Sequence, residues 1–466
     1  MDLTLRRNTI ALGLDFGLFM VGLAFVSHHT VLPAFAAHLG ASNVLIGAVP
    51  AVMTAGFYLP SLFAAGHTET LPRKLPFVLR YTLLERVPPL GLAAVAFWLA
   101  EPAPRLALAC VLVLLLAMAG VGGLLMPAWL DVVGRAIPVG IRGRFFAAGH
   151  LLGSVGGLLA SLLTTYILAT LPPPPSYGLC FLAGAACFGL SYLALTRTSE
   201  PPGAAPAAPV PFRTYLGRVA TVLHRNRNFS RFLVARSLGL LGAMTTSFYA
   251  VFALRAHAVA DWQVGLFTTT LLGGQLLGTT VLGWVGDRFG HRLTLTVSMA
   301  ASIAANLVAI SAGSPETLYW AFGLAGVYLA GIQVSSHAML LEFAPRVSEQ
   351  PTYIGLGNTA LGPVTFGAPL VAGVLTDSLG FVPAFATAAA FGALALCAFT
   401  GWVRDPRRPT APPAPSVRAS RRDELGGGLR PGLRPPPEPP RRPRQSRGSE
   451  RNAPTLEAGS QRDACG

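Results

Sequence analysis

The chain has 466 residues, of which 52% are hydrophobic and only 12% are charged, and its mean hydropathy is +0.54. Soluble proteins have roughly a quarter of their residues charged, so water is excluded as the solvent for most of this chain. The formal net charge is +15, but the basic residues lie between apolar runs and in the C-terminal tail. This distribution disfavours a nucleic-acid-binding protein and favours a membrane protein with a basic cytoplasmic side.

Apolar runs long enough to cross a bilayer, which takes roughly 20 residues, recur along most of the chain. Each is expected to be an α-helix, because in lipid a helix satisfies the hydrogen bonds of its own backbone. Twelve spans are predicted, at residues 9–31, 43–65, 76–100, 105–130, 146–170, 177–197, 229–256, 263–286, 292–313, 317–341, 353–376 and 381–403. The first resembles a signal peptide ending at Ala34-Phe35-Ala36, but its length and its interruption by Asp15 favour an uncleaved span.

Basic residues are distributed unequally between the two sides of these predicted spans. With the N-terminus in the cytoplasm, the outside loops contain only Arg105 and Arg255. The inside set is Arg6, Arg7, Arg73, Lys74, Arg135, Arg142, Arg144, Arg197, Arg213, Arg218, Arg225, Arg227, Arg288, Arg292 and Arg346. This asymmetry predicts an even number of spans, with both termini cytoplasmic, in the inner or plasma membrane of the cell.

Composition divides the chain into four parts. Residues 1–197 and 229–405 each contain six predicted spans. The linker 198–228 starts rich in proline and then, from Phe212 to Asn226, places apolar residues at helical spacing. That spacing predicts an amphipathic helix at the membrane surface. Residues 406–466 are rich in Pro, Arg, Gly and Ser and too poor in apolar residues to form a core, so a disordered cytoplasmic tail is predicted.

A short, charged loop punctuated by glycine joins the eighth and ninth predicted spans. Its fixed positions are Gly283, Asp287, Arg288, Gly290 and Arg292. This spacing resembles the signature loop of the major facilitator superfamily, G-x-x-x-D-R-x-G-R-[KR], with His291 in place of one basic residue. The resemblance extends over roughly residues 9–405. It implies an all-α transporter of twelve transmembrane helices, in two pseudo-symmetric six-helix halves that rock around a central cavity.

Charged residues at the cytoplasmic helix ends recur in both parts of the chain, which indicates a duplicated six-helix unit. The matched positions are Glu69 and Lys74 with Asp287 and Arg292, and Asp131 and Arg135 with Glu342 and Arg346. The resemblance implies that Asp287 and Arg288 take part in a breakable acid–base latch on the cytoplasmic side, with Arg292 and Glu342 close by. The alternative is that these charges only anchor the topology.

Ionisable residues inside the spans are expensive in lipid and therefore indicate function. Asp15 lies in the first predicted span, and Glu85 and Arg86 lie in the third, directly before Pro88-Pro89, which should kink the helix. Adjacent residues on a helix point about 100° apart, so Glu85 and Arg86 should each find a partner on another helix, and Asp15 is a plausible partner for an arginine. Snorkelling towards the cytoplasm is the alternative, chiefly for Arg80, Arg231 and Arg236.

His28 and His29 lie near the outer end of the first predicted span. Because histidine titrates near physiological pH, the pair could sense outside protons, and the alternative is a wet interface with no special role. Asp15, Glu85 and Arg86, together with these histidines, are the candidates for proton or substrate coupling.

The function predicted from these features is a secondary active transporter that moves a small solute by alternating access, coupled to protons. A facilitative uniporter, and a non-transporting assembly or receptor protein on the same fold, are the alternatives. The sequence contains no catalytic constellation, no metal-ligand spacing and no nucleotide-binding loop, so no enzyme activity, metal or cofactor is expected. The expected partners are a small-molecule substrate, protons and the lipid bilayer, and the protein is expected to be a monomer.

The direction of transport and the substrate are left open. A stripe of glycines in the fifth predicted span partly resembles an antiporter motif of the same superfamily, G-x-x-x-G-P-x-x-G-G, but Ser154 stands at its proline. The stripe consists of Gly149, Gly153, Gly156 and Gly157.

Overall fold

The computed structural model describes residues 3–69, 71–201, 225–344 and 350–407, and every regular element in these ranges is a helix. The all-helical membrane architecture predicted from the sequence is thereby confirmed. The predicted amphipathic helix of the linker, Arg346 and almost all of the predicted tail lie outside the described residues. The side chain of Glu69 does so as well.

Nine helical elements form the N-terminal half of the described chain. They are α1 (Leu3–Phe25), α2 (Val31–His38), α3 (Asn43–Glu69), α4 (Leu75–Arg86), α5 (Pro88–Ala94), the π-helical turn η1 (Val95–Leu99), α6 (Pro104–Ala136), α7 (Val139–Thr170) and α8 (Pro175–Leu195). Within this half α3 packs on α6, α1 packs on α7 and α8, and α4 packs on α6.

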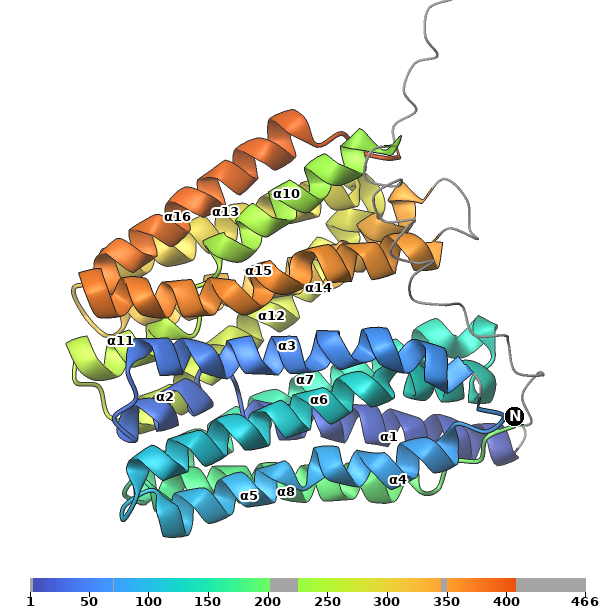
Figure 1. Ribbon diagram of the computed structural model, residues 1–466, viewed down its shortest axis with the longest axis horizontal. Helices are drawn as coiled ribbons and strands as arrows, with labels where there is room; N and C mark the ends of the chain where they lie inside the picture. The colour runs from blue at the N-terminus through green and yellow to red at the C-terminus, as the bar shows by residue number, and fades with distance from the viewer. Residues whose placement is uncertain (1–2, 70, 202–224, 345–349, 408–466) are drawn as a thin grey trace, which may run out of the picture. The chain divides into compact units, whose positions relative to one another are not determined.

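The C-terminal half repeats this arrangement (Figure 1). Its elements are α10 (Arg227–Gly242), α11 (Phe248–Ala256), α12 (Trp262–Phe289), α13 (His291–Ile310), α14 (Thr317–Phe343), α15 (Gln350–Leu379), α16 (Phe381–Cys397) and the π-helical turn η3 (Ala398–Trp402). Within it α12 and α13 pack on α14, and α16 packs on α10 and α13.

Each of the twelve predicted spans coincides with one helix or with consecutive helical pieces. Among the described residues, 10 segments are long and apolar enough to cross a membrane by themselves. The other two predicted spans are α3, whose apolar stretch is described over Asn43–Tyr58, and the pair α10 and α11, which is broken in the middle.

Local chemistry explains where the spans are interrupted. α4 ends at Arg86 and α5 begins at Pro88, because a proline lacks a backbone N–H and clashes with the preceding turn. The first and seventh spans break at equivalent places, over residues 26–30 and 243–247, where serine, threonine and histidine replace the apolar pattern. Hydroxyl side chains offer the backbone local alternatives to the helical bond; Thr246 Oγ1, for example, donates to the Ala243 carbonyl oxygen at 2.8 Å.

The two halves contact each other at the end of the molecule that bears α2 and α11. α3 lies beside α15, α7 lies beside α12, and α2 contacts α11 (Figure 1). The N-terminus of α3 is held across the interface by Asp377 of α15, whose carboxylate accepts the N–H groups of Asn43 and Val44 at 3.0 and 3.1 Å. The backbones approach so closely that a Cβ on Gly47 would lie 2.2 Å from the Pro369 carbonyl oxygen.

The end that bears the N-terminus differs. The charged clusters at this end each join residues of the same half: Lys74, Arg135 and Asp131 in one half, and Glu342 and Arg407 in the other. The structure therefore shows one conformation, closed between the halves at the α2–α11 end.

Candidate functional site

A cavity of about 570 Å³ lies between the two halves. Most of its wall is apolar, and methionine and aromatic side chains from α1, α3 and α6 contribute much of it. Among the described residues, the charged side chains of the wall are Asp15, Glu85 and Arg86, all from the N-terminal half, whereas the C-terminal half contributes uncharged residues such as Thr246, Ser247 and Thr365. The cavity is thus an apolar chamber with its fixed charges on one side.

Asp15 and Arg86 form a buried ion pair in this wall. The Arg86 Nη2 to Asp15 Oδ1 distance is 2.6 Å, and the two residues are 7% and 2% exposed. Ser191 of α8 donates to Asp15 Oδ1 at 2.7 Å, and Trp129 Nε1 of α6 donates to Asp15 Oδ2 at 2.9 Å. Arg86 also donates to Thr82, one turn earlier on α4. The pair therefore ties four helices of the N-terminal half together at one point.

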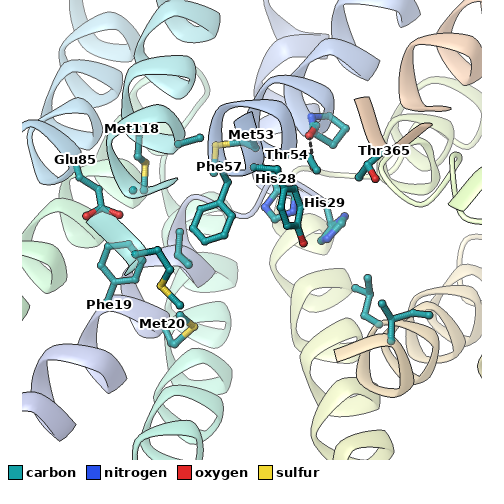
Figure 2. Close-up of a pocket in the computed structure, with 18 of the residues that line it drawn as sticks. Phe19, Met20, His28, His29, Met53, Thr54, Phe57, Glu85, Met118 and Thr365 are labelled. Atoms are coloured by element: carbon teal, nitrogen blue, oxygen red, sulfur yellow. Dashed lines mark hydrogen bonds between the residues drawn. The ribbon is translucent and has the colours of Figure 1, made fainter. Parts of the chain in front are cut away.

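Glu85 points away from this pair, as expected for its neighbour on a helix. Its carboxylate packs on α6, where a Cβ added to Gly122 would lie 2.5 Å from Glu85 Oε1. Thr82 Oγ1 donates to Glu85 Oε2 at 3.2 Å. No basic side chain of the described residues lies within ion-pair distance of Glu85. Figure 2 shows this carboxylate on one side of the pocket, near Met118 and Phe19.

His28 and His29 occupy the interruption between α1 and α2 and also line the cavity, on the side opposite Glu85 in Figure 2. Their rings are 4.1 Å apart, and Ser247 from the matching break in the seventh span donates to the His28 carbonyl oxygen at 3.2 Å. The structure therefore places these histidines where the two broken spans meet, at the closed end of the cavity. Their expected role in coupling stays a prediction.

The glycine-punctuated loop forms a tight corner between α12 and α13. Gly290 has φ +99°, a conformation that favours glycine, and Asp405 Oδ2 lies 2.5 Å from where its Cβ would be. Arg292 donates from Nε to the Phe399 carbonyl oxygen at 2.7 Å. Asp287 and Arg288 are exposed, and the Arg288 guanidinium lies 5.6 Å from the centre of the Trp284 ring.

His291, the departure from the family pattern, is buried at this corner. Its Nδ1 lies 3.1 Å from Ser335 Oγ, and its Nε2 lies 3.7 Å from Glu342 Oε1. Glu342 in turn accepts Arg407 Nε at 2.6 Å. Arg292 is thus occupied by backbone carbonyls, and Glu342 is paired with Arg407, a residue that sequence reasoning missed.

The N-terminal half has an equivalent cluster. Asp131 pairs with Lys74 and, at 2.8 Å, with Arg135 Nη2. Glu200 completes it: its carboxylate accepts the N–H groups of Lys74 and Leu75 at the start of α4 and lies 3.2 Å from Arg135 Nη1. Sequence reasoning did not select Glu200, although Arg197 to Pro201 recurs loosely as Arg404 to Pro406, which was the available signal.

In this conformation each of the two clusters lies within its own half. The ion pairs of the described residues in these clusters all lie within one half or the other, and the latch between the halves stays a prediction. A latch that holds one end closed has to be broken when that end is open, and the structure is closed at the other end.

At the closed end, Asp261 before α12 joins the halves through two side chains of the N-terminal half. His38 Nε2 lies 2.5 Å from Asp261 Oδ1, and the Tyr177 hydroxyl donates to the same oxygen at 2.7 Å. Burial raises the pKa of the Asp261 carboxyl, but the hydrogen bond and charge of His38 and the hydrogen bond from Tyr177 outweigh it, so the pKa lies below its ordinary value.

Together, two six-helix halves, a charged cavity between them and a seal at one end define a membrane transporter fold. Residues 237–439 match the family model described as Major Facilitator Superfamily. A stretch of 110 residues is 32% identical to the Inner membrane metabolite transport protein YgcS of Escherichia coli (strain K12), which covers 23% of each chain. Another match, of 121 residues at 28% identity, is to Solute carrier family 22 member 6 of Danio rerio and covers 24% of this chain and 21% of that protein. The chain thus spans less than a quarter of the length of these curated relatives.

Solved structures match over much more of the chain. The nucleoside transporter NupG has a TM-score of 0.67 at 14% identity and covers 86% of this chain and 100% of its own. A D-xylose–proton symporter has a TM-score of 0.64 at 14% identity, with coverages of 87% and 99%. A bacterial homologue of the human lysosomal transporter Spinster, in an inward-facing conformation, has a TM-score of 0.62 at 13% identity, with coverages of 86% and 97%. At these identities the likeness shows the fold.

The resemblance predicted from the charged loop is confirmed: residues 237–439, which include this loop, are similar to the Major Facilitator Superfamily. The family's sequence is recognised in the C-terminal part of the chain, which contains Gly283 to Arg292, and the fold over most of the chain is that of its transporters.

Proposed function

We propose that this protein is a secondary active transporter that moves a small solute across the cell membrane by alternating access, coupled to protons. The observation that carries the proposal is the cavity between the halves, which contains Asp15, Glu85 and Arg86 and is closed at one end by contacts between the halves. Ionisable groups at such a depth are expensive, and transport is the common reason for them. One of the proteins with a similar fold is a D-xylose–proton symporter, which supports the coupling to protons.

The orientation follows from the loop charges. The basic helix-end clusters lie at the end that bears the N-terminus, and the positive-inside rule supports a cytoplasmic location for that end and, with an even number of spans, for both termini. With that orientation, the seal between α3 and α15 closes the outside.

Alternating access predicts that this seal opens, and a distance measurement tests it without knowledge of the solute. Spin labels on Leu45 of α3 and Leu379 of α15, in a variant whose native cysteines are replaced, should give two distances in liposomes. The relative populations should change with pH. A matched pair within the N-terminal half, Leu45 and Leu106 of α6, should give one unchanged distance. A single cross-half distance at every pH would contradict alternating access in this protein.

Proton coupling is tested by transport. A thermal-shift screen of small solutes on the purified protein would identify a ligand, because a ligand that binds the folded state raises its apparent stability. Uptake of that solute into proteoliposomes should then depend on an imposed pH gradient, and Asp15→Asn and Glu85→Gln should reduce that dependence. Unchanged pH dependence in both variants would remove these residues from the mechanism and favour the facilitative uniporter.

A further inference from the structure

The charges of the cavity wall do not balance. Asp15 and Glu85 are acidic, and in the described part of the wall Arg86 is the one basic side chain apart from the histidines. Arg86 already forms an ion pair with Asp15, in which Nη2 lies 2.6 Å from Oδ1, and its guanidinium also donates to Ser191 and Thr82. Both Nη atoms of Arg86 are thus engaged, whereas Nε has no hydrogen-bond partner in the structure, and the positive charge of the guanidinium is matched by one carboxylate.

Glu85 is the group left without a counter-charge. Its hydrogen-bond donor is the neutral hydroxyl of Thr82. On α6 its carboxylate packs against Gly122, which has no side chain. An ionised carboxylate in an apolar chamber is costly unless a positive partner accompanies it. Glu85 is therefore either protonated and neutral or, when it is ionised, accompanied by a cation from the contents of the cavity.

The rest of the wall suits an organic cation. Phe57 lines the chamber, and aromatic faces attract cations through their ring quadrupoles (Figure 2). The ring of Phe19, beside Glu85, already lies 5.6 Å from the Arg86 guanidinium. Five methionines, including Met20 and Met118, add polarisable and adaptable apolar surface. A volume of about 570 Å³ is within the usual range for sites of small organic ligands.

We propose that the cavity binds a largely apolar, monovalent organic cation whose positive charge becomes the partner of Glu85. This inference rests on the proposed function and specifies its substrate class. The cation and a proton then compete for one carboxylate, which couples their movements without any further residue. Other titratable groups face the same chamber, namely Asp15, Arg86, His28 and His29. His150 lies behind the wall, with its ring centre 4.8 Å from that of Phe16. Of the two wall carboxylates, Glu85 is the one without an ion pair among the described residues.

A pair of probes that differ in charge tests the proposal on the purified full-length protein. Tetraphenylphosphonium is a permanently charged aromatic cation, and triphenylphosphine oxide is a neutral aromatic compound of related shape. Equilibrium binding of both is measured for the wild type, for Glu85→Gln and for Glu101→Gln. Glu101 is an exposed loop residue, so that variant loses the same charge outside the cavity.

The wild type and Glu101→Gln should bind the cation better than the neutral probe. Glu85→Gln should lose about tenfold or more of its affinity for the cation and keep its affinity for the neutral probe, because the loss is that of a charge pair in a desolvated site. No binding of the cation by the wild type, or an equal effect of Glu85→Gln on both probes, would overturn the proposal.

A second measurement does not depend on the folding of the variant. Dicyclohexylcarbodiimide modifies protonated carboxyl groups in apolar surroundings, and mass spectrometry of the peptide that contains Glu85 reports the extent of reaction. Tetraphenylphosphonium should protect Glu85 in the wild type, and triphenylphosphine oxide should not. Unprotected Glu85 at saturating cation would contradict the proposal. The spin-label distances need no ligand, so a failure of the cation to bind is distinguishable from a failure of alternating access.

Discussion

The buried pair of Asp15 and Arg86 allows a prediction of stability that can be worked from the structure. Arg86→Met removes the guanidinium but keeps a long apolar side chain, which leaves the Asp15 carboxylate, 2% exposed, without its cation. Removal of one partner of a buried ion pair costs about 3–5 kcal/mol. The Trp129 and Ser191 donors remain in place and keep part of the stabilisation of the carboxylate. We therefore expect a loss near the lower end, about 3 kcal/mol of the free energy of unfolding.

The double variant Asp15→Asn with Arg86→Met removes both charges and should be less unstable than the sum of the two single variants. The difference should correspond to a coupling energy of about 2 kcal/mol, within the range for residues in direct contact. Reversible unfolding in mixed detergent micelles, followed by tryptophan fluorescence, measures both quantities, and Trp129 is itself part of the cluster.

Arg80→Met is the matched control for this series. Arg80 lies on α4 as well, but it is exposed, so the same substitution should change the free energy of unfolding by at most about 1 kcal/mol. If Arg86→Met costs no more than Arg80→Met, or if the single effects of the Asp15 and Arg86 substitutions simply add, then the pair does not hold the four helices together.

Three further predictions concern the two ends of the molecule. Asp261→Asn weakens the seal, so the cross-half distance should shift to its longer component. Because the folded-state pKa of Asp261 lies below its ordinary value of 3.8, its contribution to the seal is complete above that value and is lost as the pH falls through the folded pKa; a seal that acid titration through the folded pKa leaves unaffected would contradict this. Gly47→Ala should shift the same distance, because the added Cβ would lie 2.2 Å from a carbonyl oxygen of α15. Gly273→Ala is the control and should leave the distance unchanged, because its added Cβ would meet no packed neighbour within 4 Å. The same response in both variants would count against a tight seal at Gly47. Asp287→Asn should lower the initial transport rate in proteoliposomes more than Glu69→Gln, since the C-terminal loop keeps the glycines and the middle arginine, and equal losses would mean that the loops mainly anchor the topology.

Much of the fold could be predicted from the sequence because the bilayer imposes simple rules. A span needs a certain length of apolar chain, its backbone must satisfy itself, and prolines interrupt it, so the twelve spans and the break before Pro88 were predictable. The charged loop from Gly283 to Arg292 was enough to indicate a resemblance to a known family, and its glycine at 290 has the positive φ that favours glycine.

The partners of the charged groups depended on the tertiary structure. Whether Arg86 meets Asp15, and whether Glu85 meets any cation, depends on how α1, α4 and α6 are rotated about their axes. A step of one residue turns a side chain by about 100°. The same reason explains why Glu200 and Arg407 were missed: each lies beyond the last helix of its half and reaches its partners only after that half has packed.

The sequence by itself therefore determined a membrane-spanning, two-part helical chain and the loop by which it resembles a known family. The tertiary structure decided which end is closed and that His28 and His29 face the cavity. It also decided that Glu85 stands without a counter-charge among the described residues. The physical reason is that hydropathy and turn chemistry act over a few neighbouring residues, whereas charge balance in a cavity is set by helices far apart in the chain.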